Sequence, residues 1–303
     1  MKSVFVFFFT LLNLGLYAQR VELHVLGTAQ DAGAPQIACT KKCCAQWWAE
    51  GHSENVVSLG IQDKEANTYF VFEATPNLSE QHYMISSSMP QDATFGGIFL
   101  THAHMGHYSG LLYLGKEALG GRDIPVYCMP RFSSYLKNNG PWEQLVNTGN
   151  ISIHTLNAQE TVSLSKQLAV SPIVVPHRDE YSETVGYLIR GPNKTALFLP
   201  DIDKWNRWEI AIESIIKQVD YAFLDATFYD NSELPHRDMS SIPHPFVEES
   251  LVRFQSLSVQ DKRKIYFIHF NHTNPLLNAN SEATARVKEK GFNLARTGMK
   301  IDL

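Results

Sequence analysis

Short apolar runs bounded by turn residues recur along the chain and predict β-strands. They occupy residues 21–26, 56–61, 69–72, 97–100, 125–128, 168–175, 185–189, 195–199, 221–224 and 265–268. Between several of these runs, apolar residues recur with helical spacing, at 109–119, 208–216, 245–254 and 281–290. Strands that alternate with helices predict a mixed α/β fold, and two sheets with helices on the outside would fit this order. Because no flexible linker interrupts the pattern, a single domain is the simplest interpretation.

The beginning of the chain has a different pattern. Met1, Lys2 and Ser3 precede an almost wholly apolar run over 4–16, and Ala18 follows. A charged start, a short apolar stretch and a small residue are typical of a secretory signal peptide, and the run is short for a membrane span. We therefore expect a signal peptide at 1–18 and a folded domain at 19–303. The protein would then be exported, periplasmic or secreted, with no stable membrane insertion after cleavage; an uncleaved anchor is the alternative.

Composition narrows the class of partner. The chain has 303 residues, 44% of them hydrophobic, which is enough for a large buried core. Its net charge is -5 and it has no basic cluster, so nucleic-acid binding is not expected. A small-molecule substrate is the better expectation, and the sequence contains no signal for oligomeric state.

Three histidines follow the strand predicted at 97–100. His102 and His104 are two residues apart and share a face of an extended segment, whereas His107 lies a turn further on. Solvated surface histidines are the plain alternative, but three imidazoles in such a short segment favour a metal site. Neutral imidazole is a common zinc ligand, and a catalytic zinc needs about three protein ligands and an open position for water.

Other candidate ligands also follow predicted strands. His177 comes after 168–175, Asp201 after 195–199 and His269 after 265–268. Loops gather at strand ends, where binding sites are commonly built. The sequence therefore predicts that these side chains join the histidine cluster.

This succession of a histidine cluster, a histidine, an aspartate and a further histidine resembles the metallo-β-lactamase superfamily. The resemblance implies an αβ/βα sandwich of two mixed β-sheets flanked by helices, with a dinuclear zinc site at one edge. It assigns His102, His104 and His177 to one metal and His107 and His269 to the other, with Asp201 shared between them.

Further segments are similar to the family of coenzyme PQQ synthesis protein B, namely 26–36, 225–228 and 269–275. Related cyclic phosphodiesterases hold a structural zinc with early cysteines and a histidine three residues after the last active-site histidine. That resemblance implies a structural zinc on Cys39, Cys43, Cys44 and His272. The family spacing is Cys-x-Cys-x-x-Cys, whereas Cys43 and Cys44 are adjacent here, and oxidation of two thiols is the alternative.

The chain departs from the superfamily motif at Gly106, where an aspartate normally precedes the third histidine. The active site would then hold one zinc ion, or two with extra water ligands, or two with a substitute carboxylate. Asp31 is the candidate substitute, although an aspartate near Gly33 can equally form a turn. Glu73 follows the strand at 69–72 and is expected to orient the histidine loop, or else to be an ordinary strand-end glutamate.

Together these features predict a zinc-dependent hydrolase with one or two active-site zinc ions and one structural zinc. Water activated by zinc would attack a small ester, lactone, amide or phosphodiester, with Asp201 holding the nucleophile. His244, Arg178 and Tyr229 are candidates for the substrate pocket. The alternatives are an oxidoreductase of the kind used in PQQ biosynthesis and a non-catalytic metal-binding module.

Overall fold

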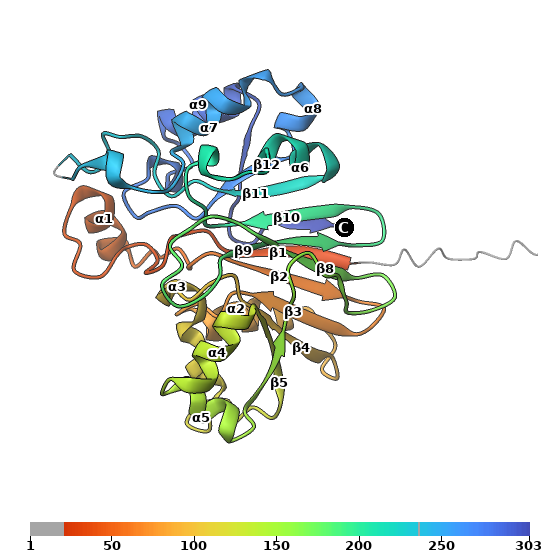
Figure 1. Ribbon diagram of the computed structural model, residues 1–303. Coiled ribbons are helices and arrows are strands. Elements are labelled where there is room, and N and C mark those ends of the chain that lie inside the picture. The colour runs from red at the N-terminus through yellow and green to blue at the C-terminus, as the bar shows by residue number, and fades with distance from the viewer. Residues whose placement is uncertain (1–20, 236) are drawn as a thin grey trace, which may run out of the picture.

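Two β-sheets, each with parallel and antiparallel neighbours, form the centre of the protein (Figure 1). The computed structural model describes residues 21–235 and 237–303, so the signal peptide expected at 1–18 lies outside the described residues. The first sheet has the strand order β14 (Lys300–Asp302), β1 (Val21–Gly27), β2 (Ser58–Asp63), β3 (Thr68–Phe72), β4 (Thr94–Phe99), β5 (Ile124–Cys128) and β6 (Ile151–Thr155). The second has the order β13 (Asn293–Leu294), β12 (Ile265–Ile268), β11 (Tyr221–Asp225), β10 (Thr195–Leu199), β9 (Val185–Arg190), β8 (Ala169–Val174) and β7 (Val162–Ser163).

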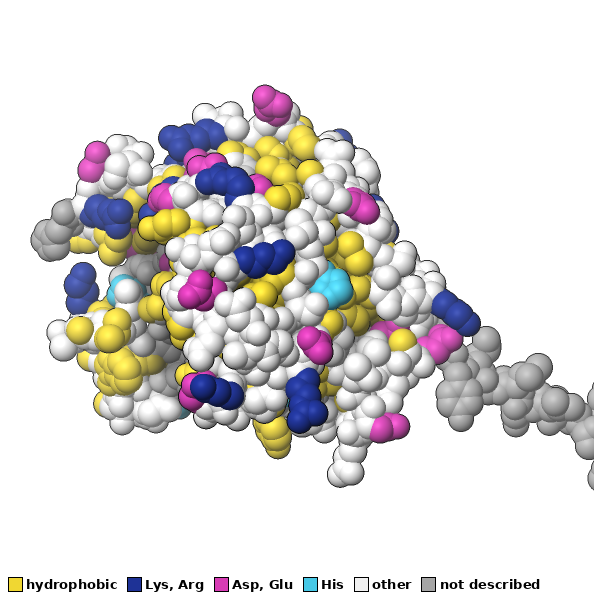
Figure 2. Space-filling view, turned by 60° about the horizontal axis from the view of Figure 1, so that its bottom comes forward, with side chains coloured by type: hydrophobic (Ala, Val, Ile, Leu, Met, Phe, Trp, Pro, Cys, Tyr) yellow, Lys and Arg dark blue, Asp and Glu magenta, His cyan; other side chains and the backbone are white. Residues whose placement is uncertain are grey.

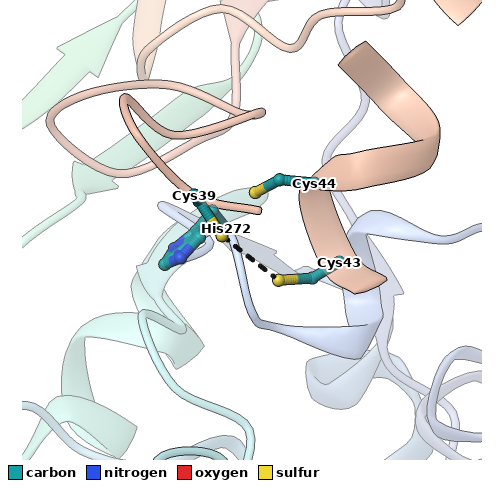
Figure 3. Close-up of side chains that lie close together, drawn as sticks. All are labelled: Cys39, Cys43, Cys44 and His272. Carbon is teal, nitrogen blue, oxygen red and sulfur yellow. Dashed lines mark hydrogen bonds between the residues drawn. The ribbon is translucent and has the colours of Figure 1, made fainter. Parts of the chain in front are cut away.

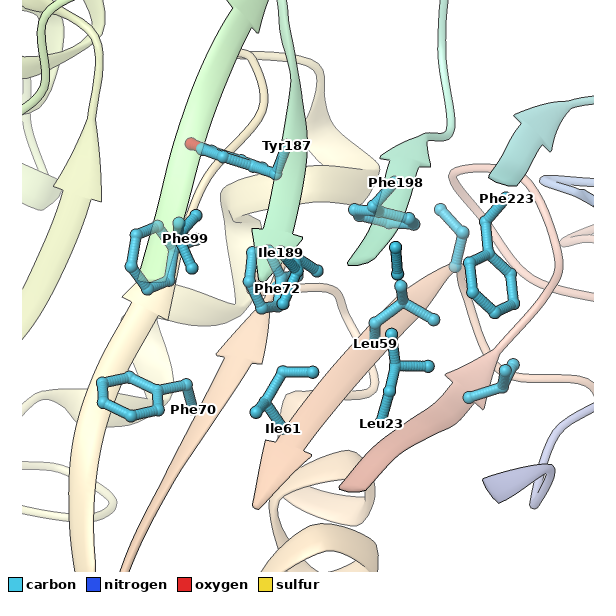
Figure 4. Close-up of a cluster of buried hydrophobic side chains, with 14 of the residues drawn as sticks. Leu23, Leu59, Ile61, Phe70, Phe72, Phe99, Tyr187, Ile189, Phe198 and Phe223 are labelled. Carbon is cyan, nitrogen blue, oxygen red and sulfur yellow. The ribbon is translucent and has the colours of Figure 1, made fainter. Parts of the chain in front are cut away.

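The two sheets pack face to face through a large hydrophobic cluster, part of which Figure 4 shows. Phe72 and Phe99 stack with ring centroids 5.0 Å apart. The hydroxyl of the fully buried Tyr187 donates a hydrogen bond to the Leu100 carbonyl at 2.5 Å, so no polar group is stranded there. Each large side chain buried in this way contributes about 1.5–3 kcal/mol, which makes the interior of the sandwich the main source of stability.

Helices cover the outer face of each sheet (Figure 1). The first sheet is covered by α2 (Leu78–Ser86), α4 (Pro130–Asn138) and α5 (Trp142–Asn147), and the second by α6 (Ile212–Gln218), α7 (Val247–Arg253), α8 (Val259–Lys262) and α9 (Glu282–Glu289). Separate hydrophobic clusters fill these two outer layers. The arrangement is the αβ/βα sandwich that the sequence predicted. None of the described helices is long and apolar enough to cross a membrane.

The predicted elements agree with the structure best for strands. Each predicted strand overlaps an observed one, whereas β6, β7, β13 and β14 were not predicted because they are short or largely exposed. The helix predicted over 109–119 is wrong, since the chain forms only a 3-10 helix over Ser109–Leu114 and then turns. The helix predicted over 208–216 begins later, at Ile212. The helices α1 (Lys42–Glu50), α2, α4 and α5 were not predicted.

The strands that precede the candidate ligands all end at one edge of the sandwich. β3 and β4 run parallel in the first sheet, and β10, β11 and β12 run parallel in the second. β8 has the same direction as β10, because each is antiparallel to β9. In Figure 1 this edge faces α1 and the short helix α3 (Met105–Tyr108). Loops from distant parts of the chain therefore meet there.

Candidate metal centre

Four predicted ligands meet at the first metal position. His102 and His104 follow β4, His177 follows β8 and Asp201 follows β10. Asp201 Oδ2 lies 3.2 Å from His102 Nε2, and Asp201 Oδ1 lies 3.2 Å from His177 Nε2. His104 Nδ1 is 2.8 Å from His102 Nε2. One donor atom from each of the four residues lies within 4.8 Å of the others, which is the arrangement that a single metal ion requires.

The ionisation of these groups suits a cation. Burial, assisted by His107, holds the pKa of His102 well below its usual range, and burial lowers that of His104 to about 4. Burial opposes ionisation of Asp201, but His177, His244 and His269 outweigh it and hold its pKa well below the usual value. His177 Nε2 and Asp201 Oδ1 are buried without a hydrogen-bond partner. Imidazoles whose pKa burial lowers, as at His102 and His104, beside an ionised carboxylate are a donor set that fits zinc.

A second position lies beside the first. His107 is in α3, His269 follows β12, and Asp31 lies in the loop after β1. Their donor atoms are mutually within 4.8 Å. His107 Nε2 and His269 Nε2 lie 3.8 and 4.0 Å from Asp201 Oδ2, so Asp201 faces both positions. Burial would lower the pKa of His107, but Glu73 and Asp31 raise it to about 10, and surroundings that favour a proton this strongly also favour a metal cation.

Glu73 has the orienting position that the sequence predicted. It is fully buried with a backbone φ of 79°, directly after β3. Its Oε1 lies 3.2 Å from His107 Nδ1 and accepts a 2.6 Å hydrogen bond from the Thr101 hydroxyl. That hydroxyl is also 2.9 Å from His102 Nδ1. One carboxylate therefore positions imidazoles of both metal positions.

Two further orienting residues were missed by the sequence reasoning. Asp203 Oδ1 is 3.2 Å from His177 Nδ1, and the Thr227 hydroxyl is 2.8 Å from His269 Nδ1. Ligands of metals commonly use their second ring nitrogen in this way. The sequence offered only one signal for these residues, namely their position near other site residues or strand ends. Asp203 lies two residues after Asp201, and Thr227 follows the end of β11.

The structure separates the three pocket candidates. His244 Nδ1 lies 3.1 Å from Asp201 Oδ1 and 2.9 Å from Asp225 Oδ2, next to the first metal position. Burial disfavours its charge, but Asp225 and Asp201 outweigh burial and raise its pKa well above the usual value. Arg178 is exposed beside His177. Tyr229 instead packs with the outer layer of the second sheet.

The cysteine cluster forms a separate site, shown in Figure 3. Cys43 and Cys44 project from the start of α1, and Cys39 and His272 approach from neighbouring loops. Their donor atoms lie mutually within 4.8 Å, and the sulfurs of Cys39 and Cys43 are 3.9 Å apart. All three thiols are free, and the remaining thiol, Cys128, is buried in the outer core of the first sheet. Cys43 and Cys44, although adjacent, both lie in the first turn of α1, and from there their side chains reach the same centre as Cys39 and His272.

Comparison with known proteins identifies the class. The profile of the Beta-lactamase superfamily domain matches residues 68–270, and the chain therefore belongs to this superfamily, whose metallo-β-lactamase fold the two sheets display. Its relatives include coenzyme PQQ synthesis protein B of Azotobacter vinelandii, which is 23% identical over 93% of this chain and 100% of the relative. The same protein of Xanthomonas oryzae pv. oryzae is 25% identical over the same shares.

Solved structures agree with this assignment. Zinc-bound PqqB from Methylobacterium extorquens superimposes with a TM-score of 0.78 at 20% identity, covering 93% of this chain and 100% of the other. A diphosphatase from the PhnP family has a TM-score of 0.63 at 21% identity, covering 94% of this chain and 97% of the other. At these identities the likeness establishes the shared fold.

Proposed function

We propose that this protein is a zinc-dependent hydrolase. The observation that carries the proposal is the convergence of His102, His177 and Asp201. Their facing atoms are buried, and His177 Nε2 and Asp201 Oδ1 form no hydrogen bond. When bound there, zinc supplies Lewis acidity, which lowers the pKa of water from about 16 to about 7 and polarises an ester-type oxygen. Buried unpartnered groups cost free energy, and a cation offsets that cost.

The protein itself supplies an acid beside this position. His244 Nδ1 faces the carboxylates of Asp201 and Asp225, which raise the pKa of the ring and so favour its protonated form. Its Nε2 has no hydrogen-bond partner among the described residues and is therefore available to a leaving group. In the proposed mechanism His244 donates a proton to the departing oxygen while Asp225 keeps the ring oriented.

The exposed side of the centre indicates where substrate binds. The side chain of His104 is 17% exposed, against 1% for His102, and its Nε2 lies 3.5 Å from Glu180 at the surface. Arg178 lies in the same loop and could contact an anion.

The surface charge of the protein is mixed elsewhere, and on the face in Figure 2 blue and magenta side chains are interspersed. This supports a small substrate, and because a similar structure is a diphosphatase, small phosphoryl compounds, phosphodiesters among them, are the first class to test.

Metal analysis tests the proposal. The chain purified without chelator should contain stoichiometric zinc, hydrolyse bis(4-nitrophenyl) phosphate, lose activity with chelator and regain it with zinc. His102→Ala should lose active-site zinc and at least about 100-fold in rate because a ligand of the first position is removed. His52→Ala, which changes an exposed histidine paired with Glu50, is the matched control and should retain both. Wild-type protein without stoichiometric metal would overturn the proposal.

The acid role of His244 has its own test. His244→Gln should slow substrates with poor leaving groups by about 10²–10⁴-fold, because they depend on proton donation. A 4-nitrophenyl leaving group departs without such help, so its hydrolysis should fall much less. Zinc content must be measured in the same samples. Equal losses for both kinds of substrate at unchanged zinc content would contradict the role.

A second candidate is an oxidoreductase of cofactor biosynthesis. It is favoured by the similarity to coenzyme PQQ synthesis protein B over nearly the whole chain. The identity of the metal separates the two functions, because redox chemistry needs a metal such as iron whereas zinc has no accessible redox change. Purified protein with stoichiometric iron and oxygen-dependent turnover would favour the second candidate.

A further inference from the structure

The second metal position includes a carboxylate that comes from the other end of the chain. Asp31 Oδ1 lies 3.3 Å from His107 Nε2. Asp31 Oδ1, His107 Nε2 and His269 Nε2 are all buried without a hydrogen-bond partner, although the Asp31 side chain as a whole is 30% exposed. Three buried ligand atoms that converge in this way, and that form no hydrogen bond outside the set, can hold a metal ion.

Gly106 makes room for this carboxylate. A Cβ at position 106 would lie 2.3 Å from the Asp31 Cα and 2.7 Å from Asp31 Oδ1. The first contact involves backbone, so a flexible side chain cannot relieve it. Any side chain at 106 therefore requires the Asp31 loop to move away from His107.

The Asp31 loop is held firmly against the loop of His269. Gln30 N donates to the Phe270 carbonyl at 2.8 Å, and Phe270 N donates to the Thr28 carbonyl at 2.8 Å. Ala29 also forms bridges with Val56 and Phe270. Since Phe270 directly follows His269, these backbone pairs fix Asp31 relative to a ligand of the second position.

We propose that Asp31 is the carboxylate ligand of a second divalent metal, beside His107, His269 and Asp201, and that Gly106 is required because Asp31 occupies the space next to it. This inference rests on the proposed function. Two imidazoles with carboxylates are a suitable donor set for zinc. The ligand therefore comes from the loop after β1, far in sequence from the histidine cluster.

Metal stoichiometry after dialysis against metal-free buffer tests the ligand role. Asp31→Ala should lose one zinc equivalent per chain relative to wild type and retain the ion held by His102, His104 and His177. Asp92→Ala, an exposed aspartate, is the control and should lose none. Cobalt substitution identifies which site is emptied, because thiolate charge-transfer absorption reports the cysteine cluster alone.

A side chain at position 106 tests the steric role. Gly106→Asp should lower the melting temperature and the metal content, and adding Asp31→Gly should not restore them, because the new Cβ would still meet the backbone of residue 31. The inference is overturned if Asp31→Ala keeps every zinc equivalent, or if Gly106→Asp alone is as stable as wild type. Either result leaves the hydrolase proposal standing as long as wild type binds zinc, whereas wild type without zinc overturns that proposal itself.

Discussion

At the scale of single residues, the histidines of the centre are positioned by groups on their second ring nitrogen. Glu73 holds His107, Asp203 holds His177 and the Thr227 hydroxyl holds His269. The sequence indicated the ligands because polar residues directly after apolar strands stand out. It did not indicate Asp203 or Thr227, because an orienting role depends on a contact across loops that a local pattern does not contain.

Glu233 provides a residue-scale prediction of pH dependence. The backbone N–H of Tyr229 donates a 2.7 Å hydrogen bond to the Glu233 carboxylate, which lowers its pKa. Burial has the larger effect and raises the pKa of Glu233 from 4.5 to about 7. The folded state therefore binds the proton more tightly than the unfolded chain. The resulting stabilisation is complete below the unfolded pKa and is lost as the pH rises through the folded value.

Glu233→Gln stays neutral and should avoid that loss. Between pH 5 and pH 8, the free energy of unfolding of wild type should fall by about 1–2 kcal/mol relative to that of Glu233→Gln, after allowance for solvent screening. Urea denaturation of both proteins at each pH measures this difference. Glu65→Gln, which changes an exposed side chain, should show no such gain, and a pH-independent difference for Glu233→Gln would refute the assignment.

At the scale of elements, apolar runs were more informative than helical spacing. A strand buried between two layers is largely apolar on both faces, so its sequence is distinctive, as in β10. The segment after His107 has helical spacing, but Gly110 packs against the backbone of residues 74 and 75, and the chain forms a short 3-10 helix instead. Packing between elements overrides local spacing there.

Gly110→Ala tests that close contact. A Cβ at this position would lie 2.0 Å from the Thr75 carbonyl oxygen, so the 3-10 helix over Ser109–Leu114 and the loop after β3 must separate. The expected loss in free energy of unfolding is about 1–3 kcal/mol, measured by urea denaturation. Gly140→Ala is the matched control, because nothing lies closer than 4.0 Å to a Cβ there. Equal stability of the two variants would show that the contact relaxes freely.

At the scale of the whole molecule, the cysteine cluster connects segments that are distant in sequence. Cys39, Cys43 and Cys44 lie in the loop after β1 and in α1, whereas His272 follows β12, more than 200 residues later in the chain (Figure 3). A zinc ion there would join α1 to the loop that begins with His269. Because such a bond closes a very long loop, it would stabilise the fold.

Cys43→Ser is therefore expected to lose one zinc equivalent and to lower the melting temperature, while the histidine centre keeps its metal. Elemental analysis and thermal denaturation measure the two effects. Cys128→Ala removes a thiol outside the cluster and should leave the zinc content unchanged. A disulfide between Cys39 and Cys43 in the purified protein, found by mass spectrometry without reduction, would contradict structural zinc.

The sequence by itself determined a mixed α/β chain and the polar residues that follow its strands, because buried strands are apolar and ligands follow their ends. The sandwich of two sheets came from the resemblance of those residues to the metallo-β-lactamase superfamily. Only the tertiary structure decided which carboxylates face which histidines. Asp31 with Gly106, and Asp225 with His244, are pairs separated by many residues in the chain. Their contacts follow from how loops of both sheets meet, and no local spacing encodes that meeting.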